Sequence, residues 1–212
     1  MNSGVISTGR RPAWLRPALL DRAEQAIIVV LWTLLALRVD HSVNPLAPLL
    51  LASESAVALF VLIRRPTGNI SMKLGDWLLA ITATAAPLLI MPGANPFPAL
   101  MWPGIALIVL GNAWQIAAKL VLRRSFGIAP ANRGVKVSGP YRFMRHPMYA
   151  GYLMAHIGIT MLMGSPLNLL IYAIGWTAQI RRLDAEEAWL SRDESYRAYQ
   201  GQVRWRLIPG LY

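Results

Sequence analysis

The chain has 212 residues, of which 55% are hydrophobic and only 15% are charged, and its mean hydropathy is +0.41. Soluble domains carry about 25% charged residues, so the composition argues against an ordinary water-soluble globule. In a protein with a polar surface, a net charge of +11 would indicate binding to nucleic acid. Here the basic residues separate long apolar stretches, which is typical of membrane proteins, and we expect no nucleic-acid partner. The chain has no cysteine and only three histidines, so we expect neither disulfides nor a metal site.

Four apolar stretches precede the middle of the chain, at residues 23–39, 46–63, 76–91 and 99–122. A helix needs about 20 apolar residues to cross a bilayer. A fifth stretch, residues 148–180, is divided by Gly164-Ser165-Pro166, a pattern that ends one helix and starts another. We therefore expect a tight helical hairpin there. The predicted fold class is an all-α, polytopic transmembrane bundle of six segments, or five if one early stretch does not cross.

The distribution of basic residues predicts the orientation of this bundle. The N-terminal tail, the second and fourth loops and the C-terminal tail carry four, three, seven and six Lys or Arg residues, whereas the loops between them carry a single one, Arg38. Cytoplasmic loops are enriched in Lys and Arg. The protein is thus expected to be integral to the membrane and multi-pass, with both termini cytoplasmic.

Two cytoplasmic segments are too elaborate to be simple connections. The loop at 123–147 is rich in Gly and Pro and ends in His146-Pro147, where Pro147 fits the first position of a helix. His146 then lies at the membrane boundary, either as a functional group or as a helix cap. A C-terminal helix is expected from about residue 179 to residue 200.

In that helix Arg182 and Glu186 share one face, with Glu187 adjoining it. Paired carboxylates there could hold a cation or accept a proton. The alternative interpretation is a solvated helix with ordinary salt bridges.

Together these segments carry a family resemblance. The sequence GPYRFMRHPMYAG, residues 139–151, followed by Arg182-x-x-x-Glu186-Glu187-x-x-Leu190, resembles the C-terminal signature of the isoprenylcysteine carboxyl methyltransferase family, which the related phospholipid N-methyltransferases share. The ending Tyr196-x-x-Tyr199-x-x-x-Val203-x-x-Arg206-x-Ile208-Pro209 and the upstream Arg124-Ser125-Phe126-Gly127-Ile128 are similar as well. The first four helices resemble no family that we can name.

The resemblance implies one membrane domain over residues 1–212, with N-terminal transmembrane helices in 1–122 and a cofactor-binding and catalytic region in 123–212. It implies S-adenosyl-L-methionine as the cofactor, S-adenosyl-L-homocysteine as its product, and a cytoplasmic pocket formed by the motif loop, the hairpin and the C-terminal helix. It assigns Arg182 and Glu186 to catalysis at the methyl acceptor. The positions that it places at the cofactor are Lys136, Val137, Gly139, Tyr141, His146, Pro147, Tyr149, Gly151, Glu186 and Glu187.

A lipidic or prenylated acceptor must reach this cofactor from within the bilayer. Polar residues inside the spans are candidates for its access route: Glu54, Asn112, Gln115 and His156. An intramembrane acid such as Glu54 is a functional candidate by default, although it could equally be protonated and paired. The alternative for Asn112, Gln115 and His156 is hydrogen bonding between helices.

The leading interpretation is S-adenosylmethionine-dependent O-methylation of an isoprenylcysteine-like carboxylate. Three alternatives stay open at this point: a phospholipid N-methyltransferase of the phosphatidylethanolamine type, a sterol-reductase-like enzyme that uses NADPH, and a membrane adaptor without catalytic activity. The residues do not decide between a carboxylate and an amine acceptor. Membrane lipids are expected partners in every case.

Overall fold

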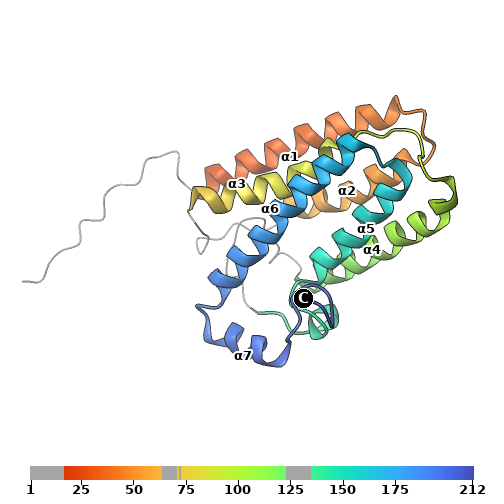
Figure 1. Cartoon of the computed structure of the whole chain (residues 1–212). Coiled ribbons are helices and arrows are strands. Elements are labelled where there is room, and N and C mark those ends of the chain that lie inside the picture. The colour runs from red at the N-terminus through yellow and green to blue at the C-terminus, as the bar shows by residue number, and fades with distance from the viewer. Residues whose placement is uncertain (1–16, 64–70, 72, 123–134) are drawn as a thin grey trace, which may run out of the picture.

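A computed structural model of the chain describes residues 17–63, 71, 73–122 and 135–212 (Figure 1). Every regular element in the described part is helical, which confirms the all-α class. The elements in chain order are α1 (Pro17–Asp40), α2 (Ala47–Ile63), α3 (Leu74–Ala85), η2 (Ala86–Leu89), η3 (Pro98–Leu100), α4 (Met101–Leu122), η5 (Gly139–Arg142), α5 (Pro147–Met163), α6 (Pro166–Leu190) and α7 (Glu194–Gln202). The basic N-terminal tail and the 124–128 motif lie outside the described residues.

The apolar stretches expected from the sequence coincide closely with α1 to α4, and the fifth stretch divides at Gly164-Ser165 as predicted. Pro166 opens α6, and the Ser165 side chain caps it by accepting a hydrogen bond from the Asn168 backbone N–H. The C-terminal helix differs from the prediction. The helix that starts at Pro166 continues to Leu190, and a separate α7 begins after Asp193, which caps it through the backbone N–H of Ser195.

Glycine pairs hold α4 and α5 together. A Cβ atom at Gly158 would lie 2.5 Å from the backbone oxygen of Gly104, and one at Gly151 would lie 2.7 Å from the backbone oxygen of Gly111. Real Cβ atoms do not approach backbone oxygens so closely, so these sites admit only glycine. The two helices therefore pack backbone to backbone, the arrangement that small residues permit in membrane helices.

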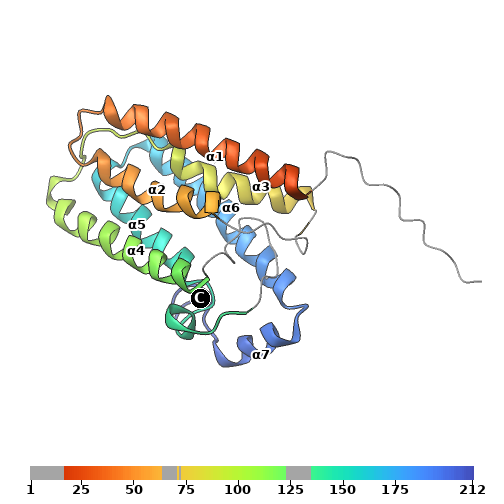
Figure 2. The same ribbon diagram turned by 180° about the vertical axis from the view of Figure 1, so that it is seen from behind.

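The α5–α6 hairpin is open and not tight as expected. α5 packs along α4, whereas α6 packs along α3, and the two helices diverge from their turn (Figures 1 and 2). Asn168 holds the start of α6 against the segment that follows η2. Its side-chain amide donates to the backbone oxygen of Met91 at 2.9 Å and accepts from the Met91 N–H at 3.0 Å. This separation leaves space between α5 and α6.

The C-terminal segment folds back onto the motif that precedes α5. The backbone N–H groups of Arg145 and His146 donate to the backbone oxygens of Trp205 and Arg206, at 2.9 and 2.8 Å. The Tyr199 hydroxyl donates to the backbone oxygen of Tyr141 at 2.7 Å. Segments about sixty residues apart in sequence thus form one compact end of the molecule, beyond the helical bundle.

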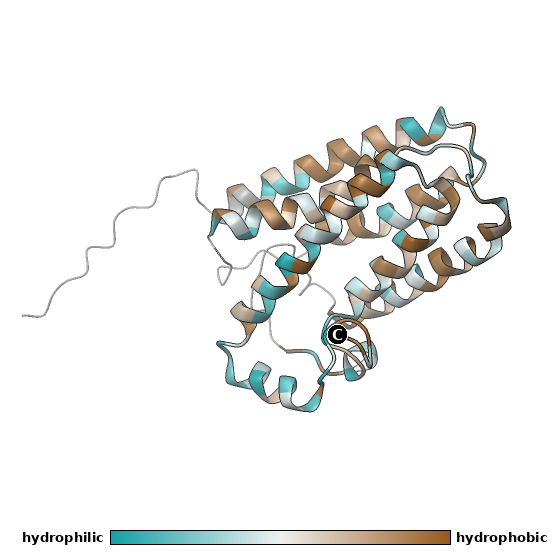
Figure 3. Ribbon diagram, viewed as in Figure 1, coloured by the Kyte–Doolittle hydropathy of each residue, from teal (hydrophilic) through white to brown (hydrophobic). Residues whose placement is uncertain are grey.

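By length and composition, one helix among the described residues, Pro98–Leu122, could cross a membrane. The outer faces of the bundle are nevertheless strongly apolar, whereas α7 is mostly hydrophilic (Figure 3). Exposed apolar side chains occur on all six helices of the bundle: Leu19, Val30 and Leu37 in α1, Leu59 in α2, Leu78 in α3, Trp102, Val109 and Leu120 in α4, Ile157 in α5, and Leu167, Leu170 and Ile174 in α6. Soluble proteins rarely expose apolar surface on this scale.

The glycine contacts yield a stability prediction. Replacing Gly158 by Ala pushes a methyl group into the backbone of α4, and overpacking of this kind costs about 1–3 kcal/mol. We expect Gly158→Ala to lower the free energy of unfolding of the purified protein by that amount. Gly75→Ala is the matched control, because nothing lies within 4 Å of a Cβ there. Equal stability of both variants would contradict the close packing.

Candidate active site

Two consecutive carboxylates near the end of α6 face different neighbours, because successive residues of a helix point about 100° apart. Glu187 is buried against the motif before α5 and against α7, whereas Glu186 is half-buried and faces Tyr149. The resemblance assigned both residues to the cofactor. In the structure Glu186 and Glu187 have different neighbours, which suit the two carboxylates to different roles.

Glu187 accepts five hydrogen bonds from protein groups. Arg145 binds it with both branches of its guanidinium, Nε to Oε1 at 2.9 Å and Nη2 to Oε2 at 3.1 Å. The Nε2 atom of His146 lies 2.8 Å from Oε1, the Tyr196 hydroxyl donates to Oε1 at 2.7 Å, and the Gln200 amide donates to Oε2 at 2.8 Å. Both carboxylate oxygens are fully used, so Glu187 organises the site from within.

The hydrogen bonds around Glu187 fix its charge. Burial alone would raise its pKa, but the hydrogen bonds from His146 and Arg145 outweigh burial and hold the pKa well below the usual range. Burial and the neighbouring Glu187 raise the pKa of Tyr196 far above its ordinary value. The Glu187 carboxylate is therefore ionised at physiological pH, and the Tyr196 hydroxyl beside it keeps its proton.

Arg145 extends this network to the C-terminal segment. Its Nη1 donates to the backbone oxygens of Val203 and Arg204, at 2.8 and 3.0 Å. Sequence reasoning gave Arg145 no role, although it directly precedes His146 in the quoted motif. The signal that could have identified Arg145 is its guanidinium, a planar fork of donors that suits a carboxylate such as Glu187.

Glu186, Tyr149 and Arg182 form a second group. The Tyr149 hydroxyl donates to Glu186 Oε2 at 2.7 Å, and the Arg182 guanidinium lies 5.2 Å from the centre of the Tyr149 ring. The His146 ring stacks on the other side of this cluster, parallel to Tyr149 at a centroid distance of 5.5 Å. The structure thus brings together four of the residues expected at the site, and Arg182 and Glu186 do share a helix face.

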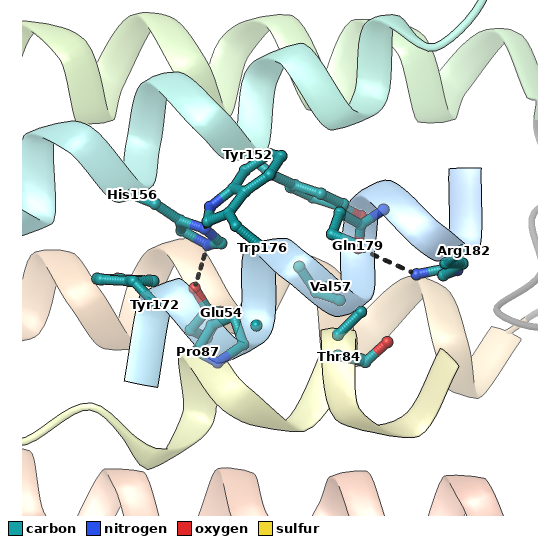
Figure 4. A pocket seen from close by; sticks show the side chains of 12 residues that line it. Glu54, Val57, Thr84, Pro87, Tyr152, His156, Tyr172, Trp176, Gln179 and Arg182 are labelled. Atoms are coloured by element: carbon teal, nitrogen blue, oxygen red, sulfur yellow. Dashed lines mark hydrogen bonds and ion pairs between the residues drawn. The ribbon is translucent and has the colours of Figure 1, made fainter. Parts of the chain in front are cut away.

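A cavity starts at Arg182 and runs between α2, α3, α5 and α6 (Figure 4). At its far end the Nε2 atom of His156 lies 3.6 Å from Oε1 of Glu54. The Trp176 indole N–H donates to Nδ1 of the same histidine at 3.2 Å. Two of the expected access residues, Glu54 and His156, therefore line one cavity with Arg182.

The other two access candidates lie along α4. Asn112 donates to the backbone oxygen of Ile108 at 2.9 Å, Gln115 donates to Asn112 at 2.6 Å, and Lys119 donates to Gln115 at 2.7 Å. These hydrogen bonds run within α4 and form a polar ladder. Neither Asn112 nor Gln115 lines the cavity at Arg182.

The remaining expected cofactor residues are spread around the start of α5. Lys136, Val137 and Gly139 are exposed, and Gly139 has a φ of +57°, which favours glycine. Tyr141 is buried, and burial followed by the nearby Glu186 raises the pKa of its hydroxyl well above the ordinary value. Pro147 is the first residue of α5 as predicted. The side of Gly151 that a Cβ would occupy faces Gln115 and the backbone of α4.

The fold and the site define an all-helical protein in which a buried carboxylate–arginine centre adjoins a cavity within a helical bundle. The phospholipid methyltransferase family model matches residues 99–197, just under half of the chain. Protein-S-isoprenylcysteine O-methyltransferase A of Arabidopsis thaliana is 26% identical over 121 residues, which cover 54% of this chain and 61% of that protein. The Schizosaccharomyces pombe protein-S-isoprenylcysteine O-methyltransferase is 27% identical over 107 residues, 47% of this chain and 45% of that protein.

A third relative, the Dictyostelium discoideum protein of the same name, is 28% identical over 78 residues, 35% of this chain and 32% of that protein. These matches confirm the resemblance to the isoprenylcysteine carboxyl methyltransferase family. The chain covers less than two thirds of the length of each of these relatives. The family-model match contains the whole α4–α6 region with Arg145, Arg182 and both carboxylates, whereas Glu54 lies outside it.

The different surroundings of the two carboxylates predict different stability effects. Glu187→Gln removes the charge opposite the buried Arg145, and breaking a buried pair in this way costs about 3–5 kcal/mol. Glu186→Gln is the comparison variant, because Glu186 is half-buried and is only one of several groups that attract the buried Arg182, so we expect a smaller loss, of about 1 kcal/mol. Chemical unfolding of the purified variants measures both.

The pH dependence of the wild type gives an independent check. Because the folded pKa of Glu187 lies below the unfolded value of about 4.3, its contribution is complete above that pH and is lost as the pH falls towards the folded pKa. The stability difference between wild type and Glu187→Gln should therefore shrink on acidification below about pH 4. A difference that is constant with pH would contradict an ionised Glu187.

Proposed function

We propose that the protein is a multi-pass membrane methyltransferase that transfers a methyl group from S-adenosylmethionine to a carboxylate on a lipidic acceptor, such as a prenylated cysteine. The observation that carries this proposal is the position of Arg182. Its guanidinium lies between the Tyr149–Glu186 group on one side and the cavity within the bundle on the other. A cation at that boundary suits an anionic group at the end of a lipid.

The membrane location is supported by the surface of the bundle. Apolar side chains are exposed on all six of its helices, and the hydrophilic α7 adjoins only one end of the bundle (Figure 3). The segments predicted to be cytoplasmic carry 20 of the 21 Lys and Arg residues of the chain, and both the motif before α5 and α7 belong to these segments. We infer six crossings, α1 to α6, with the termini and the Glu187 centre on the cytoplasmic side.

The residues around Glu186 fit S-adenosylmethionine. Glu186 uses one oxygen for the Tyr149 hydroxyl and is half-buried, so it can also accept hydrogen bonds from an ammonium group. The aromatic faces of Tyr149 and His146 suit a cationic sulfonium, and the exposed segment around Gly139 lets backbone groups approach a ligand. When bound, the cofactor supplies a methyl group that is carried on a positively charged sulfur. After transfer of the methyl group, the rest of the cofactor is a neutral thioether.

The chain itself contributes alignment and exclusion of water. Arg182 would hold the acceptor carboxylate through its planar fork of donors, and Gln179, which lines the same part of the cavity, adds a side-chain amide. Holding the two reactants at attack distance is potentially worth about 7–11 kcal/mol. Methylation of a carboxylate releases no proton, so this reaction requires no base.

A phospholipid amine is the second candidate acceptor, because the matching family model is described as phospholipid methyltransferase. An amine loses a proton on methylation, and Glu186 would be the group that accepts it. The charge of Arg182 at the mouth of the cavity favours the carboxylate. A panel of lipid acceptors that contains both classes decides between them, and reduction of a substrate by NADPH would point instead to the sterol-reductase-like alternative.

The cofactor is tested by calorimetric titration of the detergent-purified protein with S-adenosylhomocysteine. We expect saturable binding by the wild type and a dissociation constant at least about tenfold higher for Glu186→Gln, which corresponds to one lost charge-assisted hydrogen bond. Glu194→Gln, an exposed acid at the start of α7, is the matched control and should bind normally. A folded wild-type protein that fails to bind would remove the methyltransferase proposal.

The role of Arg182 is tested by separating cofactor binding from turnover. We expect Arg182→Ala to retain most of its affinity for S-adenosylhomocysteine and to lose methyl transfer to N-acetyl-S-farnesylcysteine by at least about a hundredfold, because the acceptor carboxylate loses its partner. The exposed neighbour Arg181 provides the control variant, Arg181→Ala, which should remain active. Turnover by Arg182→Ala at the wild-type rate would contradict a role of Arg182 in acceptor binding and would indicate a structural role.

A further inference from the structure

The cavity at Arg182 is far more polar than a hydrocarbon chain requires. Besides apolar groups, it is lined by an acid, a histidine and several hydroxyl, amide and indole side chains (Figure 4). Two of these polar groups, the Tyr172 hydroxyl and the Gln179 amide nitrogen, have no hydrogen-bond partner among the described residues. Tyr172 is 7% exposed and Gln179 is 6% exposed. A buried polar group without a partner costs about 1–3 kcal/mol, so both groups point to a polar ligand.

The two groups lie at opposite ends of the cavity. Tyr172, Trp176, Gln179 and Arg182 follow one face of α6, and the rise of the helix places Tyr172 about 15 Å from Arg182 along its axis. Gln179 belongs to the Arg182 end, where its amide oxygen lies 3.5 Å from Arg182 Nη1. Tyr172 belongs to the Glu54 end, beside His156 (Figure 4). The cavity therefore offers two polar sites with an apolar passage between them.

The chemistry of the far site follows from the histidine. Since the Trp176 N–H donates to Nδ1 of His156, this nitrogen carries no proton, and a neutral ring bears its proton on Nε2, towards Glu54. Glu54 also interacts electrostatically with Lys119 on the neighbouring α4. Its carboxyl group thus already lies beside a histidine and interacts with a lysine of the protein, so a neutral ligand suits this site.

A hydroxyl group satisfies the far site best. It can donate its proton to the Glu54 carboxylate and accept a hydrogen bond from Tyr172, which an alkyl end cannot do. We propose that the preferred methyl acceptor carries a hydroxyl group that binds between Glu54 and Tyr172 while its carboxylate binds at Arg182. The proposal rests on the proposed methyltransferase function and adds to it a preference for lipids that are polar at both ends.

The proposed hydroxyl site is formed by three helices, α2, α5 and α6. Glu54 comes from α2, which lies outside the residues that match the family model, whereas Tyr172 and His156 come from α6 and α5. The Arg182 end of the cavity thus lies within the residues that match the family model, and the far end is completed by a helix that lies outside them.

The test is a titration of the full-length protein in lipid nanodiscs with two probes, dodecanoic acid and its ω-hydroxy analogue, after subtraction of titrations into empty nanodiscs. The fully extended probes approximate the length of the cavity. We expect the hydroxylated probe to bind about tenfold more tightly, the effect of one or two added hydrogen bonds. In Tyr172→Phe this preference should fall to about threefold or less.

Thr177→Val is the matched control, because it removes an exposed hydroxyl from the same helix, one that donates to the backbone oxygen of Ala173. It should retain the full preference. Equal affinities of the two probes in the wild type, a failure of the hydroxylated probe to bind, or an unchanged preference in Tyr172→Phe would each overturn the proposal.

Titration of the same preparation with S-adenosylhomocysteine separates this proposal from the function on which it rests. A protein that binds S-adenosylhomocysteine without a preference between the probes overturns only the hydroxyl site. A protein that prefers the hydroxylated probe without binding S-adenosylhomocysteine retains the hydroxyl site but loses the proposed methyltransferase function.

Discussion

The end of this molecule that lies beyond the helical bundle depends on one buried carboxylate. Glu187 neutralises Arg145, fixes the ring of His146 and accepts hydrogen bonds from Tyr196 and Gln200 on α7. The segments that carry these donors also bury apolar side chains, among them Met144, Tyr199 and Val203. The charge-assisted hydrogen bonds add direction to this packing and fix how the motif, the end of α6 and α7 are oriented.

This centre positions the groups proposed to carry the chemistry without contacting a substrate itself. Because Glu187 locks the end of α6 and the start of α5, Glu186 and Arg182 are presented to Tyr149 from a fixed backbone. The glycine contacts between α4 and α5 supply the same rigidity on the membrane side. The space for an acceptor then arises where α5 and α6 diverge, each held by a different neighbour.

The sequence predicted the parts of this structure that depend on local pattern. Apolar length, Pro166 and the Gly164-Ser165 break place the helices, and the spacing of Arg182 and Glu186 places them on one face. The different roles of Glu186 and Glu187 could not be predicted from the sequence, because they depend on which distant donors surround each carboxylate. Arg145 and Tyr172 were missed for the same reason. The expected tight hairpin failed because the pairing of α5 with α4 and of α6 with α3 is decided by packing between helices, which no local pattern encodes.

The long sequence separation within the Glu187 centre has a consequence for biosynthesis. Its donors span Arg145 to Gln200, and Arg145 is held in turn by the backbone at Val203 and Arg204. During translation these last segments leave the ribosome after α1 to α6 have been made. Until then Glu187 and Arg145 lack most of the surrounding hydrogen bonds. The Glu187 centre is therefore completed after the helical bundle has been made, and a chain that ends before α7 is expected to lack this centre even when α1 to α6 have formed.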